Sequence, residues 1–310
     1  MQTYASVAQF SSEKPTVVTI GTFDGVHAGH RVLLKRLTEG AKNLNYESVI
    51  FTMFPHPRMV LQPHIDIKLI QSIDERQQVL EKVGIDHLVV EPFTKEFSRM
   101  EADEFVQNIL VNILNAKKVI IGYDHRFGRN RVADVRDLHR FGAEYGFEVE
   151  EVTAQEVNEI TVSSTKIRRA LEDGNLDVAN SYLGDPFTLT GTIVRGKEIG
   201  RTLGYPTANL HIREAYKLIP KNGVYIVRAI MNGSPVYGVM NIGTNPTLGG
   251  GERTIETHFL NFEGDLYEKQ IQIELLSRIR DEQHFDSTKA LTAAIAQDQK
   301  IAEAYVRAHQ

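Results

Sequence analysis

The ten residues Gly21–His30, GTFDGVHAGH, combine three glycines with two histidines three positions apart. They follow a short apolar run, Thr16–Ile20, and precede leucines at helical spacing. Backbone N–H groups at a helix N-terminus attract phosphate, and glycines let a phosphate approach the backbone. His27 and His30 would share one face of the first helical turn. Both imidazoles could then donate hydrogen bonds to a triphosphate and stabilise departing pyrophosphate, so the segment indicates a nucleotide site.

A metal-binding pair or a single capping histidine is the alternative interpretation of these imidazoles. Two ligands do not complete a site, and no third ligand is evident from the sequence. The placement between a strand and a helix favours the nucleotide interpretation.

Ser164–Arg168 presents two hydroxyls and an arginine at the start of a predicted helix. Hydroxyls at a helix N-terminus together with a guanidinium form a second cradle for an anion. Taken alone, the segment would be an ordinary capped helix with a solvated basic face.

The segment Gly191–Glu198 nearly spells a P-loop. The match fails because Glu198 stands where a Ser or Thr must hold magnesium and no apolar helix follows. The segment overlaps a second glycine-rich stretch, Arg195–Asn209, whose last four residues, PTAN, would by themselves indicate only a proline turn with side-chain caps. Further on, Thr254–Phe259 alternates as a strand, with Glu256 and His258 on one face. A glutamate on a strand is usually just a solvated charge.

Two kinds of element would position these groups. Up to about residue 184 strand-like and helix-like segments alternate, which predicts a doubly wound parallel sheet with helices on both faces. Ligands bind such sheets beyond the carboxyl ends of the strands. After Asp185-Pro186 short strands follow one another between Gly- and Pro-containing turns, which indicates a small antiparallel barrel. A closing helix is predicted over Ser287–Ala308, with an inner stripe at Ala290, Leu291, Ala294, Ile295, Ala302 and Val306.

Composition narrows the class of protein. The chain has 310 residues, of which 42% are hydrophobic and 24% charged, typical of a globular protein. Lys and Arg number 35 against 40 Asp and Glu, a formal net charge of −5, which argues against a dedicated nucleic-acid binder. The chain contains no cysteine, which excludes disulfides and thiolate–metal sites. No membrane span or secretory signal is evident, so a cytoplasmic location is expected.

Four segments of the first half resemble the adenylyltransferase domain of bacterial bifunctional FAD synthetases, within the wider H-x-G-H nucleotidyltransferases. They are Gly21–His30, Phe54–Pro57, Gly122–Gly128 and Val162–Arg168. The resemblance implies ATP binding by Gly21, Phe23, Asp24, Gly25, His27, His30, Ser164, Thr165 and Arg168, and flavin binding by Pro55, Pro57 and Asp124. His27, His30 and Arg168 would be catalytic. His125 and Ala133 depart from the family pattern, which usually has an aromatic residue and a glycine there.

The second half is similar to riboflavin kinases over Arg195–Asn209, the E-T-H triplet at Glu256 and the run Ile279–Asp286. By this resemblance a glycine-rich flap covers the ATP phosphates and the P-T-A-N turn holds Mg²⁺. The residues implied are Gly196 and Arg201 for ATP, Thr207 and Asn209 for the metal, Glu256 as catalytic base beside the flavin, and Arg280 against the flavin.

The combined resemblance implies two ATP-dependent steps, phosphorylation of riboflavin to FMN by residues 185–310 and adenylylation of FMN to FAD by residues 1–184. Mg²⁺ would be the cofactor and ATP the co-substrate. Two alternatives stay open: one half is silent, or the chain is a non-catalytic flavin-binding protein; the intact motifs in both halves disfavour both. No nucleic-acid or membrane partner is expected, and the chain would be a monomer or a weak homo-oligomer.

Overall fold

The computed structural model describes residues 1–153, 162–196, 199–244 and 253–309. The predicted turns within residues 245–252 and the P-loop position Glu198 lie outside these ranges. Backbone contacts divide the chain into two units, residues 1–68 with 73–163, and residues 69–72 with 164–310. Each unit is described by itself below.

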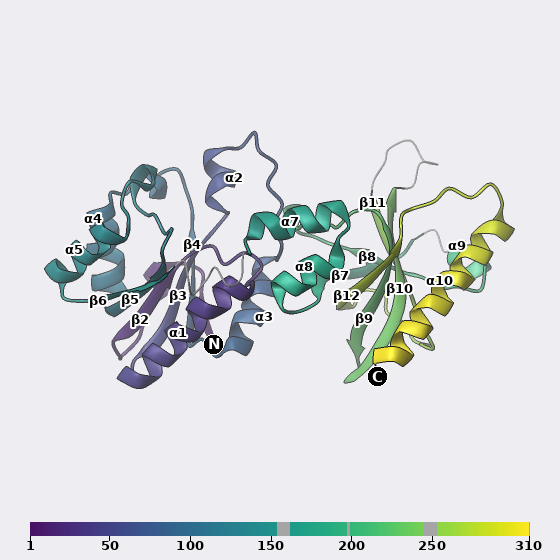
Figure 1. The fold of residues 1–310 in the computed structure, drawn as a ribbon, viewed down its shortest axis with the longest axis horizontal. Helices are drawn as coiled ribbons and strands as arrows, with labels where there is room; N and C mark the ends of the chain where they lie inside the picture. Colours follow the sequence, from purple (N-terminus) through teal and green to yellow (C-terminus); the bar gives the residue numbers. More distant parts are fainter. Residues whose placement is uncertain (154–161, 197–198, 245–252, 310) are drawn as a thin grey trace. The chain divides into compact units, whose positions relative to one another are not determined.

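The first unit is a six-stranded sheet in which every strand pair is parallel, in the order β1-β4-β3-β2-β5-β6 (Figure 1). The strands are β1 (Gln2–Tyr4), β2 (Thr16–Ile20), β3 (Glu47–Phe54), β4 (His87–Pro92), β5 (Ala116–Gly122) and β6 (Glu148–Val152). β2 is buried at all five positions, as its apolar, β-branched sequence predicts for a central parallel strand. The predicted doubly wound sheet is confirmed.

Helices cover both faces of this sheet (Figure 1). The helices of this unit are α1 (Ala28–Leu44), α2 (Pro57–Leu61), α3 (Ile73–Val83), α4 (Ala102–Glu104) and α5 (Val135–Tyr145), with short helical turns η1 (Val7–Gln9), η2 (Phe97–Arg99) and η4 (Arg129–Arg131). After α4 the chain continues as a π-helix, η3 (Phe105–Ile113). α1 and α3 pack on one face, and η3 and α5 on the other.

The order of the strands decides where a ligand can bind. From β2 the chain moves through β3 and β4 toward one edge of the sheet, and then returns to place β5 on the other side of β2. β2 and β5 therefore flank the point at which the strand order reverses. The connections leaving their carboxyl ends diverge there, which opens a crevice.

The second unit is a closed barrel in the order β10-β11-β8-β7-β12-β9, with antiparallel pairing throughout. Its strands are β7 (Phe187–Val194), β8 (Ala208–His211), β9 (Gly223–Met231), β10 (Ser234–Thr244), β11 (Arg253–Phe259) and β12 (Gln270–Arg280). Its helices are α7 (Ser164–Asp173), α8 (Leu176–Leu183), α9 (Ile199–Thr202) and α10 (Thr288–His309), the last lying along the barrel (Figure 1). The predicted small antiparallel barrel with a C-terminal helix is confirmed.

Two features of this unit differ from the expected pattern. β8 was not predicted, because four residues with an asparagine and a histidine give no apolar alternation. In α10 the predicted stripe is wrong at Ala290, which is exposed, while the unpredicted Asp298 is only 4% exposed. Asp298 is buried because it accepts hydrogen bonds from Arg280 at 2.7 and 3.0 Å.

Candidate functional site

Three loops named from the sequence leave the carboxyl ends of adjacent parallel strands β3, β2 and β5. They begin at Gly21, Pro55 and Gly122, and a parallel sheet places them at the same edge. Two hydrogen bonds join the first loop to β3: Gly21 N–H donates to the Phe51 carbonyl, and Thr52 Oγ1 to the Thr22 carbonyl. The strand order thus places the first three motifs of the first half at the same edge of the sheet.

The two motif histidines stack on each other at the start of α1. Their ring centroids are 3.7 Å apart and their planes differ by 15°. His27 is the N-cap, and its Nδ1 accepts the backbone N–H of His30 at 3.3 Å. Because Nδ1 accepts, a neutral His27 carries its proton on Nε2. The predicted shared face is confirmed, and the histidine cap is part of the same arrangement.

Burial keeps both imidazoles neutral at pH 7. It lowers the pKa of His27 from 6.5 to about 4, although the Asp24 carboxylate acts in the opposite direction. Burial also lowers the pKa of His30 well below its usual value, and the neighbouring His27 and Arg76 lower it further. Within the described residues, His30 Nδ1 is buried without a hydrogen-bond partner. Each ring is therefore neutral and has one N–H group, which can donate a hydrogen bond to an anionic ligand.

A buried arginine supports this loop from α3. The Arg76 guanidinium donates to the Thr22 carbonyl at 2.6 Å and lies 3.5 Å from the Asp24 carboxylate. The two side chains are 3% and 1% exposed. Sequence reasoning missed Arg76, although its spacing from Leu80 and Val83 puts it on the inner face of the helix. A buried ion pair is thus fixed beside the predicted phosphate loop.

The loop also depends on unusual backbone conformations. Gly25 has a φ of 91°, and the adjoining non-glycine residues Phe23 and Val26 have φ of 47° and 40°. β-Branched residues rarely adopt positive φ. Such strain recurs where function dictates the path of the chain. A Cβ on Gly21 would approach the Phe23 ring at 3.0 Å, so this position also favours glycine.

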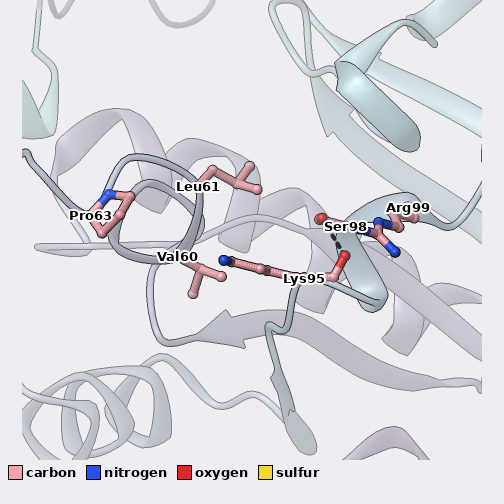
Figure 2. A pocket seen from close by; sticks show the side chains of 6 residues that line it. All are labelled: Val60, Leu61, Pro63, Lys95, Ser98 and Arg99. Atoms are coloured by element: carbon pink, nitrogen blue, oxygen red, sulfur yellow. Dashed lines mark hydrogen bonds between the residues drawn. The ribbon is translucent and has the colours of Figure 1, made fainter.

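The second loop leads into a small cavity of about 260 Å³ (Figure 2). Pro55 follows a cis peptide bond, and His56 caps α2, which begins at Pro57. Val60, Leu61, Pro63, Lys95, Ser98 and Arg99 line the cavity. Figure 2 shows the Lys95 side chain extending toward Val60, while Ser98 Oγ donates to the Lys95 carbonyl at 2.7 Å. An apolar wall faces two cations, a composition that suits a ligand with a flat apolar body and an anionic group.

The third loop carries Asp124, which is exposed, and the departure His125. Burial lowers the pKa of His125 to about 4, and its ring stacks on Phe127 at 6.1 Å. Ala133, the other departure, is buried and pairs through its backbone with Phe127. The fourth motif, with Ser164, Thr165 and Arg168, opens α7 as predicted, and α7 belongs to the second unit. The contacts of these three residues with ATP stay a prediction.

In the barrel, three predicted residues from separate segments converge. The β8–β11 register pairs Glu256 with Asn209 across the ladder. Thr207, just before β8, donates through Oγ1 to Glu256 Oε2 at 3.3 Å. A hydroxyl, an amide and a carboxylate thus gather at one end of β8. The described residues hold no cluster of three or more His, Cys, Asp or Glu that could bind a metal ion.

The glycine-rich segment closes over these groups. A Cβ on Gly196 would lie 2.3–2.6 Å from three atoms of the Asn209 side chain. A Cβ on Gly200 would lie 2.3 Å from the Tyr205 carbonyl and 3.3–3.4 Å from Thr207. The clash at Gly200 is with backbone, so only glycine fits there, whereas a Cβ at Gly196 would force the Asn209 side chain to move. The glycines and the P-T-A-N turn, separate in the sequence, therefore form one structure.

A cavity of about 590 Å³ adjoins this cluster. Thr207, Arg201 and Arg195 line it on one side, and its aromatic lining comes from Phe259, Phe262 and Tyr267. The Arg195 guanidinium lies over the Tyr267 ring, 5.0 Å from the centroid. Cations next to aromatic faces suit a phosphorylated ligand with a flat base. The aromatic residues were missed because a loop phenylalanine or tyrosine has no distinctive sequence signal.

Arg280 lies at the end of β12 and is paired with Asp298 of α10 through two guanidinium nitrogens. Its guanidinium also lies 5.8 Å from the centroid of the Phe285 ring. The bidentate pair fixes the orientation of the guanidinium plane. Asp298 thus holds Arg280, the predicted flavin contact, in one orientation, and the sequence did not reveal this pairing.

Comparison with known proteins gives concordant results for both halves. The family model for FAD synthetase matches residues 9–166, and that for riboflavin kinase matches residues 183–306. The bifunctional riboflavin kinase/FMN adenylyltransferase of Escherichia coli K12 is 38% identical over 93% of this chain and 92% of its own length. The Listeria monocytogenes protein of the same name is 34% identical, with coverage of 93% and 92%.

A solved structure agrees over nearly the whole chain. It is a crystal structure described as a macrolide-efflux protein from Streptococcus pneumoniae, with a TM-score of 0.87 and 30% identity, covering 97% of this chain and 98% of that one. In the described part of the present chain, no helix has both the length and the apolar character needed to cross a membrane. The family models and the curated relatives agree on two transferase domains in one polypeptide. The chain belongs to the bifunctional riboflavin kinase/FMN adenylyltransferase family, and it is an enzyme with a riboflavin kinase domain and an FAD synthetase domain.

Proposed function

We propose that the barrel cluster carries out the kinase step, with Glu256 as general base. The riboflavin 5′-hydroxyl oxygen forms a bond to the γ-phosphorus of ATP, its proton passes to the Glu256 carboxylate, and ADP leaves with the electrons of the broken P–O bond. The observation that supports this most strongly is the convergence of Thr207, Asn209 and Glu256 beneath Gly196 and Gly200. Positioning supplies most of the catalysis in such transfers.

The same cluster fits Mg²⁺. The Thr207 hydroxyl and the Asn209 amide offer hard oxygen ligands, few enough to leave room for water and phosphate oxygens. Thr207 and Asn209 would hold the ion, which when bound neutralises charge on the ATP phosphates. Gly196 and Arg201 would contact the phosphates, and Arg280, held by Asp298, would contact the flavin.

For the adenylyl step we propose that the stacked histidines serve the leaving group. A phosphate oxygen of FMN forms a bond to the α-phosphorus of ATP, and pyrophosphate leaves. The nucleophile is already anionic, so the site needs donors and no base. His27, His30 and Arg168 would stabilise the pyrophosphate, and the remaining ATP contacts would come from Gly21, Phe23, Asp24, Gly25, Ser164 and Thr165.

We place the FMN of this step at the second and third loops, with contacts from Pro55, Pro57 and Asp124. The cavity that follows Pro57 in the chain supports the placement at the second loop, because apolar side chains and the cations Lys95 and Arg99 line it. The histidine loop leaves β2, between the two strands that carry the flavin loops, and this arrangement along one sheet edge suits two substrates that react with each other.

The functional boundary is proposed after Gly184, with residues 1–184 for adenylylation and 185–310 for phosphorylation. In this proposal α7 serves the first activity through Ser164, Thr165 and Arg168, although its backbone contacts group it with the barrel. We also propose a cytoplasmic location, where ATP is available, small-molecule partners only, and a monomer or weak homo-oligomer.

The test is an incubation of the whole chain with riboflavin and MgATP, followed by chromatographic separation of riboflavin, FMN and FAD. The expected result is FMN first and FAD after it. Accumulation of FMN without FAD would mean that the adenylyltransferase half is silent. Consumption of neither flavin nor ATP would support a non-catalytic flavin-binding protein.

A further inference from the structure

His258 contacts the two residues that directly precede Thr207. It lies on β11 two positions after Glu256, and its Nδ1 is 2.9 Å from the Pro206 carbonyl oxygen. Because a carbonyl oxygen only accepts, Nδ1 carries the proton and donates. The imidazole also meets the Tyr205 ring edge-on, with centroids 5.4 Å apart and planes at 80°. The His258 side chain, on the same strand as the proposed base Glu256, thus contacts both residues of the Tyr205-Pro206 dipeptide.

The local backbone explains why a side chain is needed here. The β8–β11 ladder pairs Asn209 with Glu256 and Ala208 with Thr257, and goes no further. Pro206 has no backbone N–H, so it cannot extend the ladder as a donor. The His258 imidazole supplies a hydrogen bond just beyond the point where backbone pairing ends. The position of Thr207 therefore depends on a side-chain bond to the residue before it.

The dipeptide also ties the glycine-rich segment to the cluster. Tyr205 N–H donates to the Gly200 carbonyl at 2.8 Å, and the Tyr205 carbonyl occupies the space that a Gly200 Cβ would need. Thr207, immediately after the dipeptide, reaches Glu256 Oε2 at 3.3 Å. A shift of Tyr205-Pro206 would thus move the phosphate-covering glycine and the hydroxyl together.

We propose that His258 is a positioning residue for phosphoryl transfer, which holds Tyr205-Pro206 by its Nδ1–H so that Thr207 and Asn209 face Glu256. This inference rests on the proposed roles of those three residues in the kinase step. The bond survives protonation, because both the Nδ1–H tautomer and the imidazolium donate from Nδ1. His258 itself needs no contact with either substrate.

The experiment compares His258→Leu, which removes the donor, with His258→Asn, whose amide nitrogen can replace Nδ1–H. His211→Leu, at an exposed position on β8 of the same barrel, is the matched control. For His258→Leu we expect kcat/KM for riboflavin phosphorylation to fall about 10²-fold, the cost of a small misplacement of reacting groups. We also expect weaker binding of Mg·ADP by calorimetry. His258→Asn should recover most of both, and conversion of supplied FMN to FAD should stay unchanged throughout.

Two further measurements distinguish a failure of the positioning role of His258 from a failure of the proposed kinase function. Wild-type kinase activity in His258→Leu, alongside an inactive Glu256→Gln, would overturn the positioning role and leave the proposed function intact. Full kinase activity in Glu256→Gln would overturn the proposed function itself. Nitrogen NMR of the histidine-labelled chain, with His258 assigned by its loss in His258→Asn, should find the proton on Nδ1. A proton found only on Nε2 would overturn the inference even if His258→Leu does not fold.

Discussion

The two candidate sites handle phosphate groups with opposite chemistry. The barrel cluster offers oxygen atoms, from Thr207, Asn209 and Glu256, and includes a carboxylate. The sheet-edge site offers N–H groups, from a helix N-terminus and two neutral imidazoles, with a buried guanidinium behind them. The proposed nucleophiles explain the difference. A riboflavin hydroxyl must lose a proton, so a base is required, whereas an FMN phosphate is already an anion and needs no base.

The two sites also differ in how they are built. The barrel cluster depends on strand register, since Glu256 meets Asn209 only through cross-strand pairing. The histidine site depends on local chain geometry, since His27 and His30 are three residues apart on one helix. A register-built site is sensitive to any shift between strands, and a helix-built site to the loop that precedes it.

Replacing the Glu256 carboxylate is the strongest test of the proposed difference between the two sites. For Glu256→Gln we expect FMN formation to fall roughly 10²–10⁴-fold, because the general base is lost while side-chain size is kept. Conversion of supplied FMN to FAD should stay within about twofold of wild type. Glu263→Gln, an exposed position beside the cavity-lining Phe262 and Gly264, is the control for the charge change. Equal loss of both activities in a folded Glu256→Gln protein would contradict the division of labour.

Removing one imidazole should have the reciprocal effect. For His30→Ala we expect FAD formation from FMN to fall roughly 10²–10³-fold, the size expected when one donor to a developing anion is lost. FMN formation from riboflavin should be unaffected. His139→Ala, on the exposed side of α5, is the matched control. Both rates are measured by flavin chromatography, and a kinase defect in His30→Ala would argue against two independent sites.

A methyl group on the flap tests whether the glycines and the P-T-A-N turn act as one structure. For Gly196→Ala the new Cβ would meet Asn209 atoms at 2.3–2.6 Å, so Asn209 must move. We expect kcat/KM of the kinase for MgATP to fall roughly tenfold or more, since small displacements of positioning groups are costly. Gly40→Ala, whose Cβ would meet nothing nearer than 3.6 Å, is the control. Unchanged kinetics in Gly196→Ala would place the flap away from the metal ligands.

The neutral imidazoles predict a pH effect on stability. The pKa of His27 is lowered from 6.5 to about 4, so between these values the unfolded chain binds a proton that the folded chain does not. The stability contribution is complete above about pH 6.5 and is lost as the pH falls toward 4. His27→Asn removes the titration and keeps a capping side chain. Between pH 7 and pH 5 we expect the melting temperature of the wild type to fall a few degrees more than that of His27→Asn, measured by circular dichroism. An equal fall in both would mean that His27 is not buried as a neutral ring.

Much of the fold was predictable because its signals are local. The buried strand β2 coincides with the apolar run Thr16–Ile20, since apolar runs act within a few positions. Asp134 caps the helix α5 through a capping box, a signal that can be read within four residues. The alternation of such elements is enough to predict a parallel sheet followed by an antiparallel barrel.

The sequence-based predictions failed for residues whose interaction partners lie far away in the chain. Ala290 looked like a core position by spacing, yet the inner face of α10 centres on Asp298, because the Arg280 guanidinium 18 residues earlier requires a buried carboxylate. Sequence reasoning missed Arg76, because the groups that make its burial possible, the Thr22 carbonyl and the Asp24 carboxylate, lie more than 50 residues away. No local pattern reports such pairs.

The amino-acid sequence alone determined which chemical groups each half possesses and which of them share a helix, because histidine spacing and glycine content follow directly from the order of residues. The tertiary structure decided which groups from separate segments meet. The closed barrel sets Glu256 against Asn209 and seats Gly196 on the same side chain, since strand register and the exclusion of a Cβ exist only once the sheet has formed. Parallel pairing similarly placed three loops at one edge, because the carboxyl ends of parallel strands point the same way.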